Sequence, residues 1–398
     1  MDYITLGCLP DEVMIEILLR LSPECLMRFK AVSKSWYDLI EDPEFAVKHL
    51  MFSVQQQNLP NAPPTVLLKS LVSRDSETKQ NILSFLTLSN NDVDDSGSTV
   101  DIDVPLFENS VAMDFKGHSH GIVCLSENRT EIFLCNPATR EFYQLPPSII
   151  LLKERPLEPD GFDSSTNAVG FGYDSVSMDF KVVRVVDYWE GPFCYPSKAE
   201  VYSLSTGHWR EVKSHQSVSV YWAPSFETFY EGIYYWWAEH SYRMENSEVI
   251  QTFDMSQEVF QLIPVPDTFR RFDDDYRSLG VWKGSIVILH YPVDGEEKMF
   301  DMWAMENNQK GEVSWSMLMR IGPISGVEIP LLFVHNCDEL LMEAKDGRVV
   351  SYNMNTQHLK QLPIKGHPER FEATNFVKTL LSIKSGSKFD IQVASQTI

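Results

Sequence analysis

Two short clusters in this sequence hold side chains that could bind a metal ion. His118-Ser119-His120 is followed by Cys124, and imidazole and thiolate are ligands that zinc prefers. A zinc site needs three or four ligands, and no second pair of His or Cys residues follows at a suitable spacing. The single histidines at positions 215, 290 and 335 do not form the clustered set that a copper centre needs. We therefore interpret the first cluster as a turn leading into a strand.

The second cluster resembles a calcium loop, with Asp92-Val93-Asp94-Asp95-Ser96-Gly97 and an Asp103 in the twelfth position. An EF-hand loop ends in a bidentate Glu and lies between helices, whereas the flanks here are typical of strands. We expect a solvated acidic loop, and Asp273-Asp274-Asp275 forms another. We predict that carboxylates of these two loops form a rim that binds a basic protein. The six residues are Asp92, Asp94, Asp95, Asp273, Asp274 and Asp275.

The motifs of common enzyme classes are absent from the sequence. It contains no GxSxG elbow, HExxH pair or P-loop. Gly170-Phe171-Gly172 lacks the third glycine and the following helix of a dinucleotide-binding fingerprint. We expect a non-enzymatic protein with no catalytic residue, metal or cofactor.

The chain of 398 residues is acidic, with a formal net charge of -22, and its length suggests two units. Residues 1–50 hold five Lys/Arg and nine Asp/Glu, so most of the negative charge lies in the remainder. Such a charge disfavours nucleic acid and anionic membranes and attracts basic partners. The six cysteines are scattered, and neither a secretory pattern nor a membrane-spanning apolar stretch is present. We expect a cytosolic, or alternatively nuclear, protein.

Three short helices are predicted in the first fifty residues. Pro10 suits the first turn of a helix, and an apolar stripe follows at helical spacing. Ser22-Pro23 starts a second helix and Ser33 caps a third, which Asp42-Pro43 ends because the residue before proline avoids the α region. Helices this small bury little surface. We expect a separate protein to cover their surplus apolar side chains, the alternative being that they cap the rest of this chain.

The same helices resemble the F-box in Leu9-Pro10, the Ile17-Leu18-Leu21 stripe, Leu26-x-x-Phe29-x-x-Val32 and Ser33-Lys34-Ser35-Trp36. The resemblance covers about residues 6–50. It implies binding to a Skp-family adaptor, and through it to the cullin and RING subunits of an SCF ubiquitin ligase. By this resemblance, nine residues form the fold and the adaptor interface: Leu9, Pro10, Ile17, Leu18, Leu21, Leu26, Phe29, Val32 and Trp36.

A repeated pattern organises the rest of the chain, which consists of short β-rich runs separated by turn signals. Four segments end a strand, turn through a polar tetrapeptide and restart on a large apolar residue: CNPATREF (135–142), YSLSTGHW (202–209), FDMSQEVF (253–260) and YNMNTQHL (352–359). Two weaker copies fit at residues 85–90 and near residues 300–303. With these copies the spacing is close to fifty residues, except between the copies at 135 and 202, where we expect an insertion that includes residues 151–163. An all-β repeat of this length is typical of kelch-type propeller blades.

The predicted fold class is therefore α+β: a small three-helix F-box followed by an all-β domain, a propeller of about six blades. The domains are residues 1–50 (F-box), 51–64 (a polar, proline-bearing linker) and 65–398 (propeller). We expect FVKTLLSI (376–383) to pair with the first strands and close the ring. A β-sandwich is the alternative.

Four segments resemble the F-box-associated domain of plants: GHSHGIVC (117–124), NPATR (136–140), GFGYD (170–174) and EGIYYWWA (231–238). The start MDYITLGCLPDEV, the YDSVSMDFKVVRV stretch and the YYWWA run are most similar to S-locus F-box proteins of ribonuclease-based self-incompatibility. This resemblance implies a pollen-tube receptor that marks non-self pistil ribonucleases for ubiquitination. The alternatives are an SCF receptor for another cytosolic protein, or a kelch-type propeller lectin or enzyme.

Overall fold

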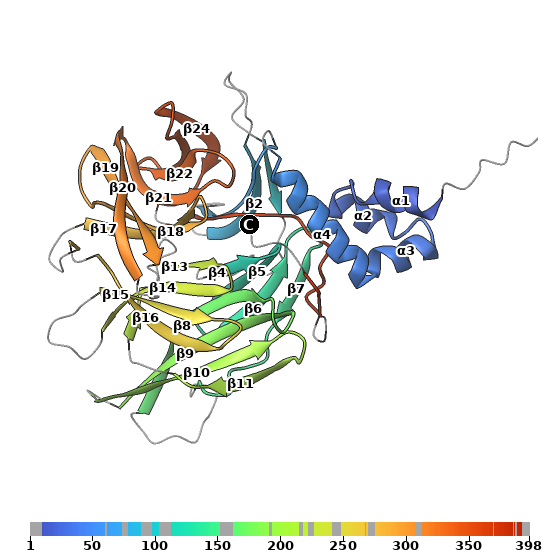
Figure 1. Cartoon of the computed structure of the whole chain (residues 1–398), viewed down its shortest axis with the longest axis horizontal. Helices are drawn as coiled ribbons and strands as arrows, with labels where there is room; N and C mark the ends of the chain where they lie inside the picture. The colour runs from blue at the N-terminus through green and yellow to red at the C-terminus, as the bar shows by residue number, and fades with distance from the viewer. Residues whose placement is uncertain are drawn as a thin grey trace, which may run out of the picture.

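The structure is a computed structural model, and it describes most of the chain. The described residues are 10–59, 62–73, 79–88, 98–102, 113–151, 162–190, 193–214, 218–221, 227–240, 248–266, 268–269, 275–307, 313–368, 370–384, 386 and 388–391. Figure 1 shows sheets arranged around a common centre, with a group of helices projecting from one side.

In the described part of the chain, four helices precede the strands, one more than predicted: α1 (Asp11–Leu18), α2 (Pro23–Phe29), α3 (Lys34–Glu41) and α4 (Pro43–Gln57). The hydroxyls of Ser22 and Ser33 accept backbone N–H groups and cap α2 and α3, as expected. Asp42-Pro43 ends α3 but also begins α4, because extended Asp42 caps the new helix and proline fits its first position. Residues 51–57 of the predicted linker are therefore helical.

The first three blades are antiparallel sheets of four strands each. Blade 1 has the order β25-β1-β2-β3, and blades 2 and 3 run in chain order. The strands are β1 (Thr65–Ser73), β2 (Lys79–Thr87), β3 (Ser98–Ile102) and β25 (Glu372–Asn375); β4 (Met113–Ser119), β5 (Ile122–Glu127), β6 (Glu131–Asn136) and β7 (Glu141–Gln144); β8 (Phe162–Asp174), β9 (Asp179–Glu190), β10 (Phe193–Ser203) and β11 (His208–Val212). The long strands of blade 3 account for much of the wide repeat spacing before residue 202.

Blades 4 to 6 complete the ring. In blade 4 the innermost strand is divided, because β12 and β13 pair with different halves of β14. The strands are β12 (Val218–Val220), β13 (Glu227–Tyr230), β14 (Ile233–His240), β15 (Glu248–Asp254) and β16 (Val259–Pro264); β17 (Asp275–Trp282), β18 (Ser285–Pro292), β19 (Glu297–Asn307) and β20 (Val313–Ser325); β21 (Val327–Phe333), β22 (Glu339–Ala344), β23 (Arg348–Asn353) and β24 (His358–Lys365). The six-bladed propeller is thus confirmed.

The strand that closes the ring is β25 and not the predicted segment 376–383. It pairs antiparallel with β1, so that Asn375 lies opposite Val66 and Glu372 opposite Lys69. The predicted closing segment follows β25 and forms no strand. Its apolar side chains pack instead against the helices and blades 2 and 3.

The repeated tetrapeptide is a hairpin turn between two outer strands of a blade. The side chains of Asn136, Asp254 and Asn353 each accept two backbone N–H groups from residues two and three positions later. The residue four positions after each Asn or Asp has a positive φ, as at Arg140 and Gln357. The Asn or Asp therefore supports the turn by the hydrogen bonding typical of Asx turns.

Adjacent blades share apolar cores, as stacked repeats must. Trp236 in blade 4 is fully buried, and its indole N–H donates to the carbonyl of Val169 in blade 3 at 3.0 Å. Leu67 and Phe85 of blade 1 share another core with Phe133 of blade 2. Among the described helices, none combines the length and apolar character needed to cross a bilayer.

Candidate adaptor interface and central cavity

The predicted F-box residues divide into an inward set and an outward set. Leu18 and Leu26 are buried in the core that the helices share with the C-terminal segment. Leu21, Phe29 and Trp36 are partly buried against the same core, and the rings of Phe29 and Trp36 lie 5.4 Å apart. These five side chains hold the helices together. Residue spacing alone could not separate them from residues that face a partner.

The outward set consists of five exposed residues: Pro10, Val13, Ile17, Val32 and Tyr37. Val13 and Tyr37 are not among the residues predicted from the sequence. Ile17 is 47% exposed and Val32 is 61% exposed, although both are large aliphatic residues. Val13 lies one turn before Ile17 on α1, so its helical spacing was the signal that could have found it. Leu9 lies outside the described residues. The outward set has the composition of a surface that another protein covers.

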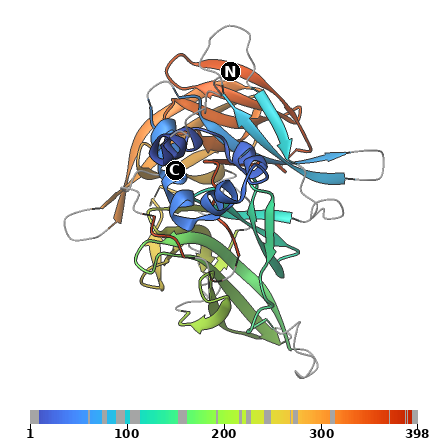
Figure 2. The same ribbon diagram turned by 90° about the vertical axis from the view of Figure 1, so that its right-hand side faces the viewer.

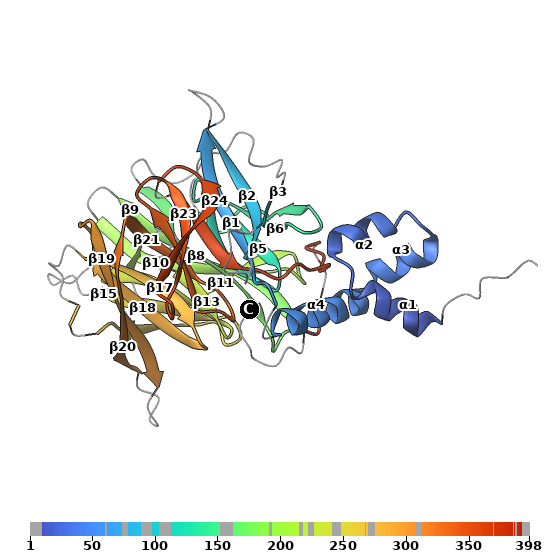
Figure 3. The same cartoon turned by 90° about the horizontal axis from the view of Figure 1, so that it is seen from above.

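The C-terminal segment 376–384 joins the helices to the propeller (Figures 1 and 3). The side-chain amide of Gln57, at the end of α4, donates to the carbonyl of Phe376 at 3.0 Å. Lys378 forms an ion pair with Glu24 of α2 at 2.6 Å. On the propeller side, the amide of Asn136 donates to the carbonyls of Thr379 and Leu381. Seen from the helical side, the helices lie in front of the propeller (Figure 2).

The predicted acidic rim is represented by one described residue. Asp92, Asp94, Asp95, Asp273 and Asp274 lie outside the described residues. Asp275 begins β17, and its carboxylate lies 3.1 Å from His290 Nε2. It is thus part of a blade strand with a partner beside it, and the rim stays a prediction.

The cluster that could have suggested zinc is built into the turn between β4 and β5. His120 adopts a positive φ in this turn, and its ring packs on those of Tyr173 and Phe180. His118 Nδ1 lies 2.7 Å from Thr374 Oγ1. Burial lowers the pKa of both histidines to about 4, so both are neutral at physiological pH. Within the described residues, no group of three metal-binding side chains is assembled.

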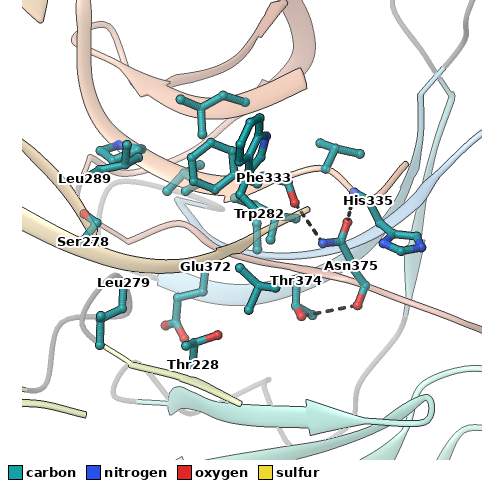
Figure 4. Close-up of a pocket in the computed structure, with 18 of the residues that line it drawn as sticks. Thr228, Ser278, Leu279, Trp282, Leu289, Phe333, His335, Glu372, Thr374 and Asn375 are labelled. Atoms are coloured by element: carbon teal, nitrogen blue, oxygen red, sulfur yellow. Dashed lines mark hydrogen bonds between the residues drawn. The ribbon is translucent and has the colours of Figure 1, made fainter. Parts of the chain in front are cut away.

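A central cavity of about 1010 Å³ lies within the ring and was not foreseen from the sequence. Strands of blades 1, 2, 4, 5 and 6 supply most of its wall, including Asp114 from β4, Glu227 from β13 and Glu372 from β25. Figure 4 shows Glu372 beside Thr228, with Trp282 and Phe333 on another side of the space. Asn58, just beyond α4, also lines the cavity and bonds to His335 at 2.9 Å. The cavity therefore reaches the junction with the helices.

Comparison with known proteins accounts for both parts of the molecule. Residues 70–383 match the model of the F-box associated beta propeller domain, and residues 6–48 match that of the F-box domain. F-box protein CPR1 of Arabidopsis thaliana is 26% identical over 399 residues, which cover 94% of this chain and 89% of the relative. An F-box/LRR-repeat/kelch-repeat protein of the same plant is 31% identical over 266 residues, 64% of each chain.

Among solved structures, an oligogalacturonate lyase in complex with manganese aligns with a TM-score of 0.37 and 9% identity, covering 75% of this chain and 85% of the lyase. A likeness that low has no bearing on activity. The F-box match implies a Skp-family adaptor as partner of the helices. The chain belongs to the F-box proteins that carry an F-box-associated β-propeller domain.

Proposed function

We propose that this chain is the substrate receptor of an SCF-type cullin ubiquitin ligase. The helices bind a Skp-family adaptor, and through it the cullin and RING subunits, while the propeller holds a protein substrate. The observation that carries this proposal is the F-box match over helices whose outward set leaves Ile17 and Val32 exposed. The receptor acts without a catalytic residue, because holding a substrate lysine near the conjugating enzyme raises its effective concentration.

The junction between the two parts supports this role. A receptor presents its substrate best when the propeller keeps one orientation relative to the ligase. The 376–384 segment provides such a connection, since it contacts α2 through Lys378 and blade 2 through Asn136. The proposed location is the cytosol, or the nucleus, where such ligases meet their substrates.

For the substrate, we propose a non-self pistil ribonuclease, in a pollen-tube self-incompatibility system. The similarity of the amino-terminal and YYWWA segments to S-locus F-box proteins supports this choice. The net charge of -22 also favours a basic partner by long-range attraction.

The test is co-precipitation of the full chain, together with its adaptor, with a panel of pistil ribonucleases at two salt concentrations. We expect binding to basic members that weakens as salt rises, because exposed charge pairs are screened. Adaptor binding without any ribonuclease binding would reject the self-incompatibility role and favour another cytosolic substrate. A chain that never captures an adaptor would reject the receptor role and favour a propeller lectin or enzyme.

A further inference from the structure

The inner wall of the cavity carries more negative than positive charge. Glu227 pairs with Lys116 at 3.1 Å, and Glu372 pairs with Lys69; both lysines are at most 4% exposed. Glu372 also accepts the backbone N–H of Phe115 at 2.6 Å. Within the described residues, the carboxylate of Asp114 has no ion-pair partner, so three carboxylates face two ammonium groups here.

Glu227 is the carboxyl whose protonation changes in this environment. Burial raises its pKa to about 7; Lys116 opposes the rise, and the carboxylates of Glu372 and Asp114 add to it. The neighbouring His118 is neutral at physiological pH and supplies no compensating charge. A further cation placed among these groups would favour the ionised form of Glu227 and would be attracted by Asp114.

The remaining walls suit a cation with an apolar stem. Aromatic side chains from several blades line the space, among them Tyr230, Tyr234, Tyr276, Trp282 and Phe333. Aromatic faces attract ammonium and guanidinium groups. Lys283 illustrates this, because its Nζ lies 4.6 Å from the centre of the Trp282 ring. The two basic lining residues, Lys283 and Arg370, are both exposed, and Lys283 already pairs with Asp338 at 3.1 Å.

We infer that the central cavity binds a cationic side chain, a guanidinium or ammonium group presented by a loop of the protein substrate, with Asp114 as its carboxylate partner. Only the source of this side chain rests on the proposed receptor function. The volume of the cavity lies at the upper end of the range for ligand sites, about 300–1,000 Å³, so a loop can enter with its side chain. A neutral side chain would leave the excess carboxylate unpaired, and the cavity would discriminate against it.

The test uses the full chain co-purified with its adaptor and two small probes in calorimetric titrations. N-acetyl-arginine amide carries the cation, and N-acetyl-citrulline amide has nearly the same shape without the charge. We expect the arginine probe to bind at least about tenfold more tightly than the citrulline probe, because charge-assisted hydrogen bonds are stronger than neutral ones. In Asp114→Asn, this preference should fall to about twofold or less.

Asp346→Asn is the matched control, since Asp346 lies in the exposed β22–β23 turn and does not line the cavity. It should bind both probes like the parent chain, and thermal melting should show that both variants are folded. Equal binding of the two probes, no binding of either, or an unchanged preference in Asp114→Asn would overturn the inference. Adaptor capture is measured separately, and its failure would contradict the receptor function. The probe titrations would then be carried out on the full chain without adaptor and would still test the cavity.

Discussion

The helical part and the propeller differ in what they bury and what they expose. In the helices, the core is apolar and several large apolar side chains, such as Ile17 and Val32, face outward. In the propeller, ion pairs lie inside: Arg184 and Glu200 of blade 3 are 2% and 0% exposed and 3.5 Å apart. We infer that another chain covers the exposed apolar side chains of the helices. The propeller has apolar cores between its blades as well, and it adds buried ion pairs to them.

The largest effect is expected from Arg184→Met in the propeller. This change leaves the Glu200 carboxylate buried without its cation, and breaking such a pair costs about 3–5 kcal/mol of unfolding free energy. Urea denaturation would measure the loss. The double variant Arg184→Met with Glu200→Gln should recover a large part of it, because no charge is then left unpaired. A single variant as stable as the parent would remove the contrast with the helices.

Leu26→Ala tests the apolar core of the helices. Leu26 is completely buried, so its truncation should cost about 2–5 kcal/mol through lost burial and a residual cavity. Ile17→Ala, on the exposed side of α1, is the control and should change the unfolding free energy by less than about 0.5 kcal/mol. Similar costs for the two variants in circular dichroism melts would contradict the division into inward and outward sets.

Acid should destabilise the propeller through His118 and His120. Their pKa in the folded protein is about 4 and the ordinary value is 6.5, so the unfolded chain binds protons more readily. The two neutral histidines therefore make their full contribution to the unfolding free energy above pH 6.5, and this contribution falls as the pH drops towards 4. At pH 4.5, His120→Asn, which tolerates the positive φ, should have lost about 2 kcal/mol less unfolding free energy than the parent chain. Parallel pH profiles for the two chains would disprove the assignment.

The smallest effect concerns the junction between the two parts. Lys378 and Glu24 are both partly exposed, so their pair should contribute less than about 1 kcal/mol. A double-mutant cycle with Lys378→Ala and Glu24→Ala would measure it. A coupling well above that range would mean that this ion pair, and not the apolar packing around Leu381, holds the segment in place.

The parts of the fold that could be predicted are those with local signals. Ser22 and Ser33 mark helix starts because a cap acts within three residues. Asn136 and its equivalents mark blade turns because the side chain bonds to its own turn. Asp42-Pro43 was ambiguous, since the same dipeptide can end one helix and begin another.

The closing strand and the cavity could not be predicted, because their determinants are distant in sequence. β25 has only four residues. Its Glu372 pairs with Lys69, which lies on β1, the first strand of the ring, far away in the sequence. The cavity combines side chains from blades at both ends of the domain, so no segment contains its pattern. The division of the F-box residues likewise depends on packing that residue spacing does not specify.

The proposed receptor function requires that the outward set of the helices binds an adaptor while the propeller binds the protein substrate. The most direct measurement is the affinity of a Skp-family adaptor for the full chain and for the variant Ile17→Asp with Val32→Asp. Because both side chains are exposed, the variant should melt like the parent chain and lose adaptor affinity by at least about a hundredfold. A variant that binds the adaptor as tightly as the parent chain would show that the outward set is not the adaptor interface.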